Sequence, residues 1–412
     1  MIIFIAFIAM TVPVLGFVLT LSYFNQYKRA LASALLCGLA FSAAIYGYIP
    51  DDGNDIFRHM ANLSLYEGIP LWGAFDIMKT DVSHISAVYI WDVWLWIIAQ
   101  FDNPILLQSS GALVGYCIIS YLIFFQAKKN GLSMGQWLPV YFIALVCFPP
   151  LEIAIGIRSA CAFLLCVLAI YSYYTKKIKK VTVAFLMGIA VFLHYAALIF
   201  LVLWGISPLF FKHKKIVMVC VVLCMIAFND FQSYLSFFYG GTTVFSDLLG
   251  NSMYSAAAYS EAGFNDSFHA LVSLVLRWGF SGFLLLIIRR GLDQQGKINN
   301  QETESYQLLN FALLLFVVAS TLLVIIGNNG LRYLGAVDIL CCLSLMDVLA
   351  INNISMWFKN GKLGLWQLIL LIGAVMQGSL YLYDMSWGTA SLSSFFSSSL
   401  LGYLSKILLS IR

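Results

Sequence analysis

Charged side chains are scarce in this chain of 412 residues: they make up only 10% of it, whereas hydrophobic residues make up 61%. The mean hydropathy of +0.89 lies far above the range of soluble domains. Apolar runs of about 18 or more residues recur along the sequence, and runs of this length are typical of transmembrane helices. The scarcity of charge therefore excludes a soluble globular protein and predicts an all-α polytopic membrane protein.

The motifs that mark many soluble enzymes are also missing. The sequence has no glycine-rich nucleotide loop with a lysine, no HExxH and no GxSxG. Its nine cysteines lie mostly inside apolar runs and show neither the spacing of a zinc site nor that of a disulfide framework. Regularly spaced intramembrane carboxylates, which would indicate a proton-coupled pump, are absent too. These absences indicate no cofactor and no metal site.

The positions of the basic residues indicate which side of the membrane each loop lies on. The formal net charge of +4 does not indicate a nucleic-acid partner, because lysine and arginine gather in short segments between apolar runs. Under the positive-inside rule such segments stay cytoplasmic. We therefore expect a cytoplasmic position for Lys28/Arg29, Lys176 to Lys180, Lys212 to Lys215, Arg289/Arg290 with Lys297, Lys359/Lys362 and Arg412.

The runs between these clusters predict about 12 to 14 spans in a single transmembrane domain over residues 1–412. The run 2–24 should be one span whose N-terminus lies outside, since Lys28 and Arg29 follow it. Four shorter runs are best interpreted as two hairpins, 138–149 with 153–174 and 181–193 with 195–211. The longest outer loops are then expected at about 49–83 and 230–267.

The runs 84–101 and 104–125 leave the side of Lys128 and Lys129 open. If both runs span the membrane, these lysines fall outside, against the positive-inside rule. If 84–101 lies in the interface instead, the lysines are inside and 138–149 crosses the membrane. Both schemes put residues 149–158 on the outer side.

The most polar stretch, PDDGNDIFRHMANLSLYE, lies in the first outer loop. A helix that begins at Asp55 would put Asp55, Arg58 and His59 on one face, at i, i+3 and i+4. Asp51 and Asp52 would precede the N-terminus of that helix, where its dipole favours anions. A solvated loop would also account for these residues, but the spacing favours a functional site.

Three further segments bring polar residues to predicted outer ends of spans: LEIAIGIRSACAF with Glu152 and Arg158, VFLHYAALIFL with His194, and NNGLRYLGAVD with Arg332 and Tyr333. Snorkelling to the interface explains a lone arginine, and a structural hydrogen bond explains a lone histidine. The alternative is a phosphate clamp, because a guanidinium presents paired donors that match phosphate oxygens.

The motifs DDGNDIFRH, GIRSACAFLL, FLHYAALIFL and NGLRYL resemble EpsG-family and Wzy-type polysaccharide polymerases. The resemblance covers about residues 45–345. It implies a GT-C-like glycosyltransferase of the bacterial inner membrane, with its active site on the periplasmic or outer face. The substrate, as both donor and acceptor, would be an undecaprenyl-diphosphate-linked oligosaccharide repeat unit of O-antigen, capsule or exopolysaccharide. A chain-length regulator is a further candidate partner beside the lipid bilayer.

The resemblance also implies roles for residues. The departing lipid diphosphate needs cationic stabilisation, and the acceptor hydroxyl needs a base. The expected catalytic residues are Asp52, Asp55, His59 and His194, and the expected substrate-binding residues are Asp51, Arg58, Glu152, Arg158, Arg332 and Tyr333. A metal-free, arginine-based site is the simpler hypothesis beside a divalent ion bridging Asp51 and Asp52. The alternatives are an O-antigen ligase or another lipid-linked-sugar GT-C enzyme and, in a different class, a flippase of the same lipid.

Overall fold

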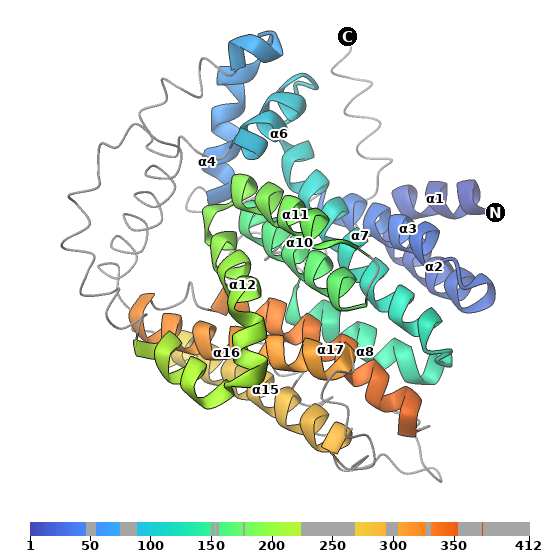
Figure 1. Cartoon of the computed structure of the whole chain (residues 1–412). Helices are drawn as coiled ribbons and strands as arrows, with labels where there is room; N and C mark the ends of the chain where they lie inside the picture. The colour runs from blue at the N-terminus through green and yellow to red at the C-terminus, as the bar shows by residue number, and fades with distance from the viewer. Residues whose placement is uncertain are drawn as a thin grey trace, which may run out of the picture. The chain divides into compact units, whose positions relative to one another are not determined.

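The computed structural model describes residues 1–46, 55–74, 89–149, 153, 156–175, 178–223, 268–293, 304–326, 331–352 and 373. Within these ranges the chain is helical, without a β-strand (Figure 1). Five helical segments there are long and apolar enough to cross a membrane: Ile105–Lys129, Ile157–Tyr174, Tyr195–Lys212, Glu304–Leu322 and Arg332–Ala350. The predicted all-α polytopic membrane fold is thereby confirmed. The total number of spans stays a prediction, because several expected runs and the loop 230–267 lie outside the described residues.

The chain divides into two compact units. The first comprises residues 1–70, 94–161 and 349–412, and the second comprises residues 71–93 and 162–348. A single transmembrane domain over residues 1–412 stays a prediction.

The first unit begins with two helices where the sequence predicts one span. Helix α1 (Ile2–Thr11) ends at Val12, and α2 (Pro13–Tyr27) begins at Pro13, which has no amide hydrogen to continue the helix. Ile5 and Tyr23 pack in one cluster with Leu36, so α1 folds back on α2. The prediction of a single span over 2–24 is wrong, because proline breaks the run and both halves pack on α3 (Ala30–Ile45).

The core of the first unit lies between α3 and α7 (Ile105–Lys129). Small residues let the two backbones approach closely: a Cβ at Gly38 would meet the carbonyl oxygen of Leu113 at 2.8 Å. Beside this crossing, the Phe41 and Tyr116 rings stack with centroids 3.8 Å apart. The buried amide of Gln108 donates to the last-turn carbonyl of Ile45 at 3.1 Å, which satisfies a polar group at the helix end.

Short helices follow the polar loop. Helix α4 (Asp55–Ala61) begins at the predicted residue and continues into the 3₁₀-helix η1 (Asn62–Tyr66). Helix α6 (Tyr89–Ala99) has 11 residues. Because residues 75–88 directly before it lie outside the described part, the choice between the two schemes for Lys128 and Lys129 stays a prediction.

The two predicted hairpins have the expected helices. Helix α8 (Met134–Cys147) starts with a capping box between Ser133 and Gln136, and α10 (Ile157–Tyr174) follows it. In the second unit, α11 (Lys180–Leu193) and α12 (Leu198–Lys212) are joined by His194 and the short helix η2 (Tyr195–Ala197).

Three long helices complete the second unit: α15 (Phe268–Asp293), α16 (Glu304–Ile326) and α17 (Leu331–Asn352). Helix α16 packs against both α12 and α15. Near one end of these helices, Ser305 of α16 donates to the Asp347 carboxylate of α17 at 2.7 Å, and Lys214 donates to Asn310 at 2.8 Å. The N-termini of α12 and α17 lie at the opposite end, which places His194 and Arg332 together.

Candidate active site

Two of the predicted site arginines occupy equivalent positions in their helices. Arg158 is the second residue of α10 and Arg332 is the second residue of α17, and each follows a Gly-Ile or Gly-Leu pair in the sequence. Arg158 is buried with 8% of its surface exposed, and Arg332 is half-buried. The N-terminus of a helix carries partial positive charge. A guanidinium in the first turn adds to that charge, so both positions favour an anionic ligand.

The second unit brings together two motifs that are far apart in the sequence. Tyr333, next to Arg332 on α17, donates its hydroxyl to the carbonyl oxygen of Ala196 at 3.1 Å. Ala196 lies in η2, directly after His194 and Tyr195. The segments FLHYAALIFL and NGLRYL therefore meet at one end of the helices.

The geometry of His194 determines which of its nitrogens can act. His194 connects α11 and η2 in an extended conformation, and its Nδ1 accepts a hydrogen bond from the amide of Ala196 at 3.2 Å. In the neutral imidazole the other nitrogen, Nε2, then carries the proton. Neutral His194 is consequently a hydrogen-bond donor at Nε2, which is suited to positioning a substrate oxygen.

Aromatic side chains pack around His194 and Tyr333. Phe163 of α10 stacks on Tyr333 with ring centroids 4.6 Å apart and lies edge-on to His194 at 6.2 Å. Tyr195 stacks on His194 at 4.8 Å. Stacked pairs of this kind hold ring planes in place and add roughly 1 kcal/mol beyond area burial. Sequence reasoning missed Phe163 and Tyr195, and the only signal available was the position of Tyr195 beside His194.

The predicted residues of the first unit are only partly described. His59 on α4 is buried whereas Arg58 is exposed, so these neighbours differ in environment although the helix begins at Asp55 as expected. The side chain of Asp55, and residues Asp51, Asp52 and Glu152, lie outside the described part. The structure therefore brings His194, Arg332 and Tyr333 together and leaves the position of the predicted carboxylates as a prediction.

Two other charged side chains are buried in the second unit. Arg277 of α15 and Asp338 of α17 are exposed by 3% and 0%, respectively. Among the described residues, no group of three His, Cys, Asp or Glu side chains is arranged to hold a metal ion. The arrangement that is described can donate hydrogen bonds and stabilise negative charge.

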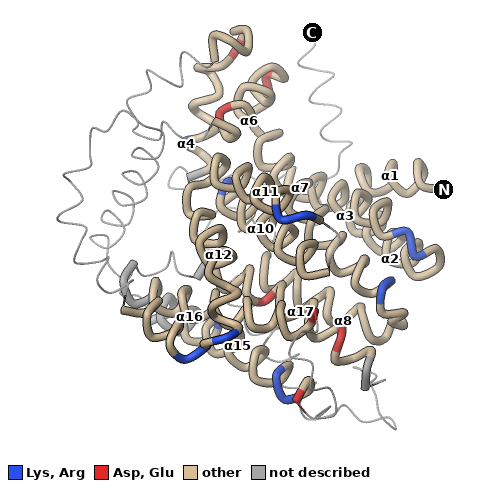
Figure 2. Tube along the Cα trace, in the orientation of Figure 1, with Lys and Arg blue, Asp and Glu red and all other residues tan. Residues whose placement is uncertain are grey.

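The long apolar helices define a polytopic membrane protein, and many of its lysine and arginine residues lie near helix ends (Figure 2). The chain belongs to the EpsG family, whose pattern matches residues 55–385. This membership confirms the resemblance seen in the sequence and supports a polysaccharide polymerase type of function, suggesting a glycosyltransferase-like enzyme. Neither a curated protein nor a solved structure matches the chain.

Proposed function

We propose that this protein is a membrane glycosyltransferase that polymerises undecaprenyl-diphosphate-linked oligosaccharide repeat units of a surface polysaccharide. The site lies on the outer face of the bacterial inner membrane. Membership of the EpsG family supports the polymerase class. The cluster of His194, Arg332 and Tyr333, at the helix ends opposite Lys212 and Arg289, supports the outer-face position.

The reaction needs a proton acceptor and a place for the departing charge. A hydroxyl oxygen of the acceptor sugar attacks the anomeric carbon of the donor glycan, and the bond from that carbon to the diphosphate oxygen breaks. The hydroxyl proton passes to a base, and the lipid diphosphate leaves with the bonding electron pair. Arg332 stabilises the diphosphate, with Arg158 as the second candidate for this role. Because His194 donates at Nε2, Asp52 and Asp55 are the preferred bases and His59 is the alternative.

The observation that carries the proposal is the hydrogen bond between Tyr333 and Ala196. It joins residues 137 positions apart and brings the segments FLHYAALIFL and NGLRYL, which carry the resemblance to the family, beside one another. If Arg332 had only a structural role, the segment around His194 and a guanidinium that can bind phosphate would not need to lie at the same helix end.

The test is a polymerisation assay with purified protein and authentic lipid-linked repeat unit. We expect a ladder of products with wild type, and a loss of at least tenfold in Arg332→Ala and in Arg158→Ala, since one lost charge-assisted contact costs roughly 1.5–3 kcal/mol. Arg332→Lys should lose most of the activity, because lysine cannot make the bidentate contact. Arg290→Ala is the matched control, since Arg290 is exposed at the opposite helix end.

Three outcomes would contradict the proposal. Movement of the lipid across vesicle membranes without a covalent product would establish a flippase. Transfer of a finished glycan to a different acceptor, with no ladder, would establish a ligase. Full activity of folded Arg332→Ala and Arg158→Ala would show that the site lies elsewhere.

A further inference from the structure

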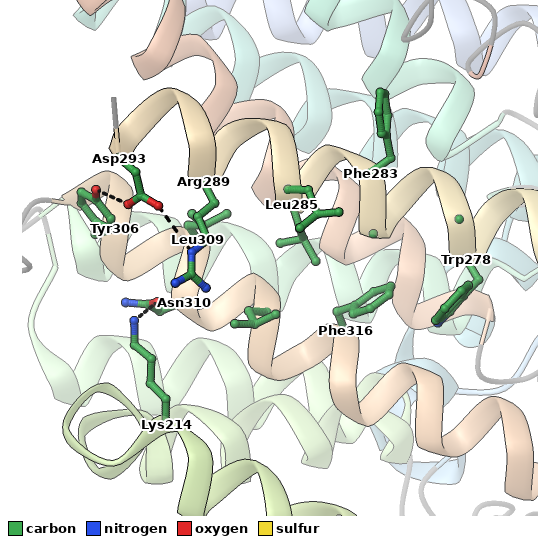
Figure 3. Close-up of a pocket in the computed structure, with 14 residues that line it drawn as sticks. Lys214, Trp278, Phe283, Leu285, Arg289, Asp293, Tyr306, Leu309, Asn310 and Phe316 are labelled. Atoms are coloured by element: carbon green, nitrogen blue, oxygen red, sulfur yellow. Dashed lines mark hydrogen bonds and ion pairs between the residues drawn. The ribbon is translucent and has the colours of Figure 1, made fainter. Parts of the chain in front are cut away.

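A groove runs along the second unit between α15 and α16, with Lys214 beside α12 at one end (Figure 3). Its volume is about 820 Å³. Most of its length is apolar: Trp278 and Phe316 stack at one end with centroids 5.8 Å apart, and leucines line the middle. Trp278 and Leu286 are exposed by 46% and 62%. Such exposed apolar walls beside α16, a candidate membrane-spanning helix, are suited to hydrocarbon chains.

The other end of the groove is polar. Lys214 donates to the side-chain oxygen of Asn310 at 2.8 Å, and Arg289 forms an ion pair with Asp293 at 3.6 Å. The hydroxyl of Tyr306 donates to the same carboxylate at 3.0 Å. Two cations and one carboxylate leave this end with a net charge of +1, which matches the single negative charge of a phosphodiester.

Lys214 and Arg289 are close enough to affect one another. Partial burial lowers the pKa of Lys214, the charge of Arg289 lowers it further, and Asp293 opposes both effects. A bound phosphate would offset the repulsion between the two cations. The polar end is therefore electrostatically suited to an anion.

The length of the groove corresponds to one leaflet. Trp278 and Arg289 are separated by 11 residues of α15, which at 1.5 Å per residue is about 16 Å. Half of a hydrocarbon core of about 30 Å has nearly the same thickness. The basic residues Lys212 to Lys215 and Arg289/Arg290 put the polar end on the cytoplasmic side. A lipid of that leaflet would thus have its headgroup at Lys214 and its acyl chain along Trp278.

From the groove's apolar walls, its length and its cationic end, we propose that it is a binding site for an anionic phospholipid of the cytoplasmic leaflet. Its phosphate contacts Lys214 and Arg289, and an acyl chain lies between α15 and α16. Basic pockets between membrane helices on the cytoplasmic side commonly bind anionic lipid headgroups. This site is separate from the cluster around His194 and does not depend on the proposed function.

Two glycines provide a variant that fills the groove without disturbing the helices. A Cβ at Gly279 would meet nothing within 4 Å, and one at Gly282 would only touch Phe316 at 3.4 Å. Gly279→Leu should therefore occupy the path of the acyl chain while improving helix propensity. Gly188→Leu on α11 is the matched control, because Gly188 also faces open space and does not line the groove.

The experiment is native mass spectrometry of the full-length protein, purified in detergent, with equal amounts of phosphatidylglycerol and phosphatidylcholine. We expect wild type to retain phosphatidylglycerol in preference to phosphatidylcholine. The double variant Lys214→Gln/Arg289→Gln should lose that preference by about tenfold, since each basic residue contributes to headgroup attraction. Lys215→Gln, an exposed lysine that does not line the groove, should behave as wild type.

Several results would overturn the proposal. Equal retention of both lipids by wild type would exclude selection of the anionic headgroup. An unchanged preference in the double variant, or unchanged lipid retention in Gly279→Leu, would exclude this groove. Glycerol 1-phosphate competing as well as phosphatidylglycerol would point to a soluble phosphate ligand instead. Thermal unfolding of each variant in the same detergent separates a lost site from a lost fold.

Discussion

At the scale of single residues, Tyr333 combines two contributions that substitutions can separate. Tyr333→Phe removes the hydrogen bond to Ala196 and keeps the stacking on Phe163, so we expect a stability loss of about 1 kcal/mol. Tyr333→Ala removes both and leaves a cavity, with an expected loss of roughly 3–5 kcal/mol. Thermal unfolding in detergent measures the difference. Equal losses in the two variants would show that the ring contributes nothing beyond its hydroxyl.

His194 allows a similar separation of structure from chemistry. In His194→Asn the side-chain oxygen can replace Nδ1 as the acceptor for the Ala196 amide, but nothing replaces Nε2. We therefore expect near wild-type unfolding and a loss of polymer of about 100-fold, within the range for the loss of one hydrogen-bond donor in an active site.

The control for this substitution is His194→Ala, which should lose stability as well because the turn loses its cap. A fully active His194→Asn variant would limit His194 to a structural role. Activity should be compared per folded protein, measured by size-exclusion chromatography.

The sequence indicates several candidate site residues but not their surroundings. Arg332 and His194 stood out because polar side chains are rare in apolar runs, and isolated polar residues at span ends are easy to recognise. Phe163 was not predicted, because a phenylalanine within an apolar helix has no distinguishing signal until its neighbours are known. Lys214 and Arg289 were interpreted only as topology markers, since the groove beside them depends on how α12, α15 and α16 pack.

At the scale of helices, the close crossing of α3 and α7 depends on Gly38. In Gly38→Ala the new methyl group would overlap the sulfur of Cys117 and press on the Leu113 carbonyl, so the helices must separate. We expect a stability loss of about 1–3 kcal/mol, typical of overpacking. Gly188→Ala is the matched control and should be neutral or stabilising by up to about 1 kcal/mol, because the methyl group meets nothing within 4 Å. Thermal unfolding compares the two variants directly.

Helix boundaries can be predicted from the sequence where charged residues or proline mark the ends of an apolar run. The hairpin around His194 agrees with the predicted runs within a few residues, because Lys180 and Lys212 frame it. The prediction of one span over the run 2–24 is wrong for a physical reason. Hydropathy does not detect that Pro13 interrupts the hydrogen bonding of a helix. Helix α1 instead packs on α2 and α3. The length of an apolar run therefore does not predict the path of the chain within it.

At the scale of the whole molecule, accessibility labelling can decide between the two topology schemes for Lys128. We expect Lys128→Cys to react with a membrane-impermeant maleimide only from the cytoplasmic side, and Ser64→Cys in η1 only from the outside. Cys220 and Cys224 would be replaced by serine in both variants to remove competing thiols. Labelling of Lys128→Cys from the outside would establish that α6 spans the membrane.

The fold-back of α1 on α2 also bears on how the protein is made. If this hairpin starts and ends on one side of the membrane, we expect α3 to be the first helix that crosses it. With 16 residues α3 extends about 24 Å, less than the hydrocarbon thickness, and its main packing partner α7 is synthesised later. We therefore expect α3 to insert stably only once α7 has emerged, and its insertion to depend on a factor that shields α3 during that interval.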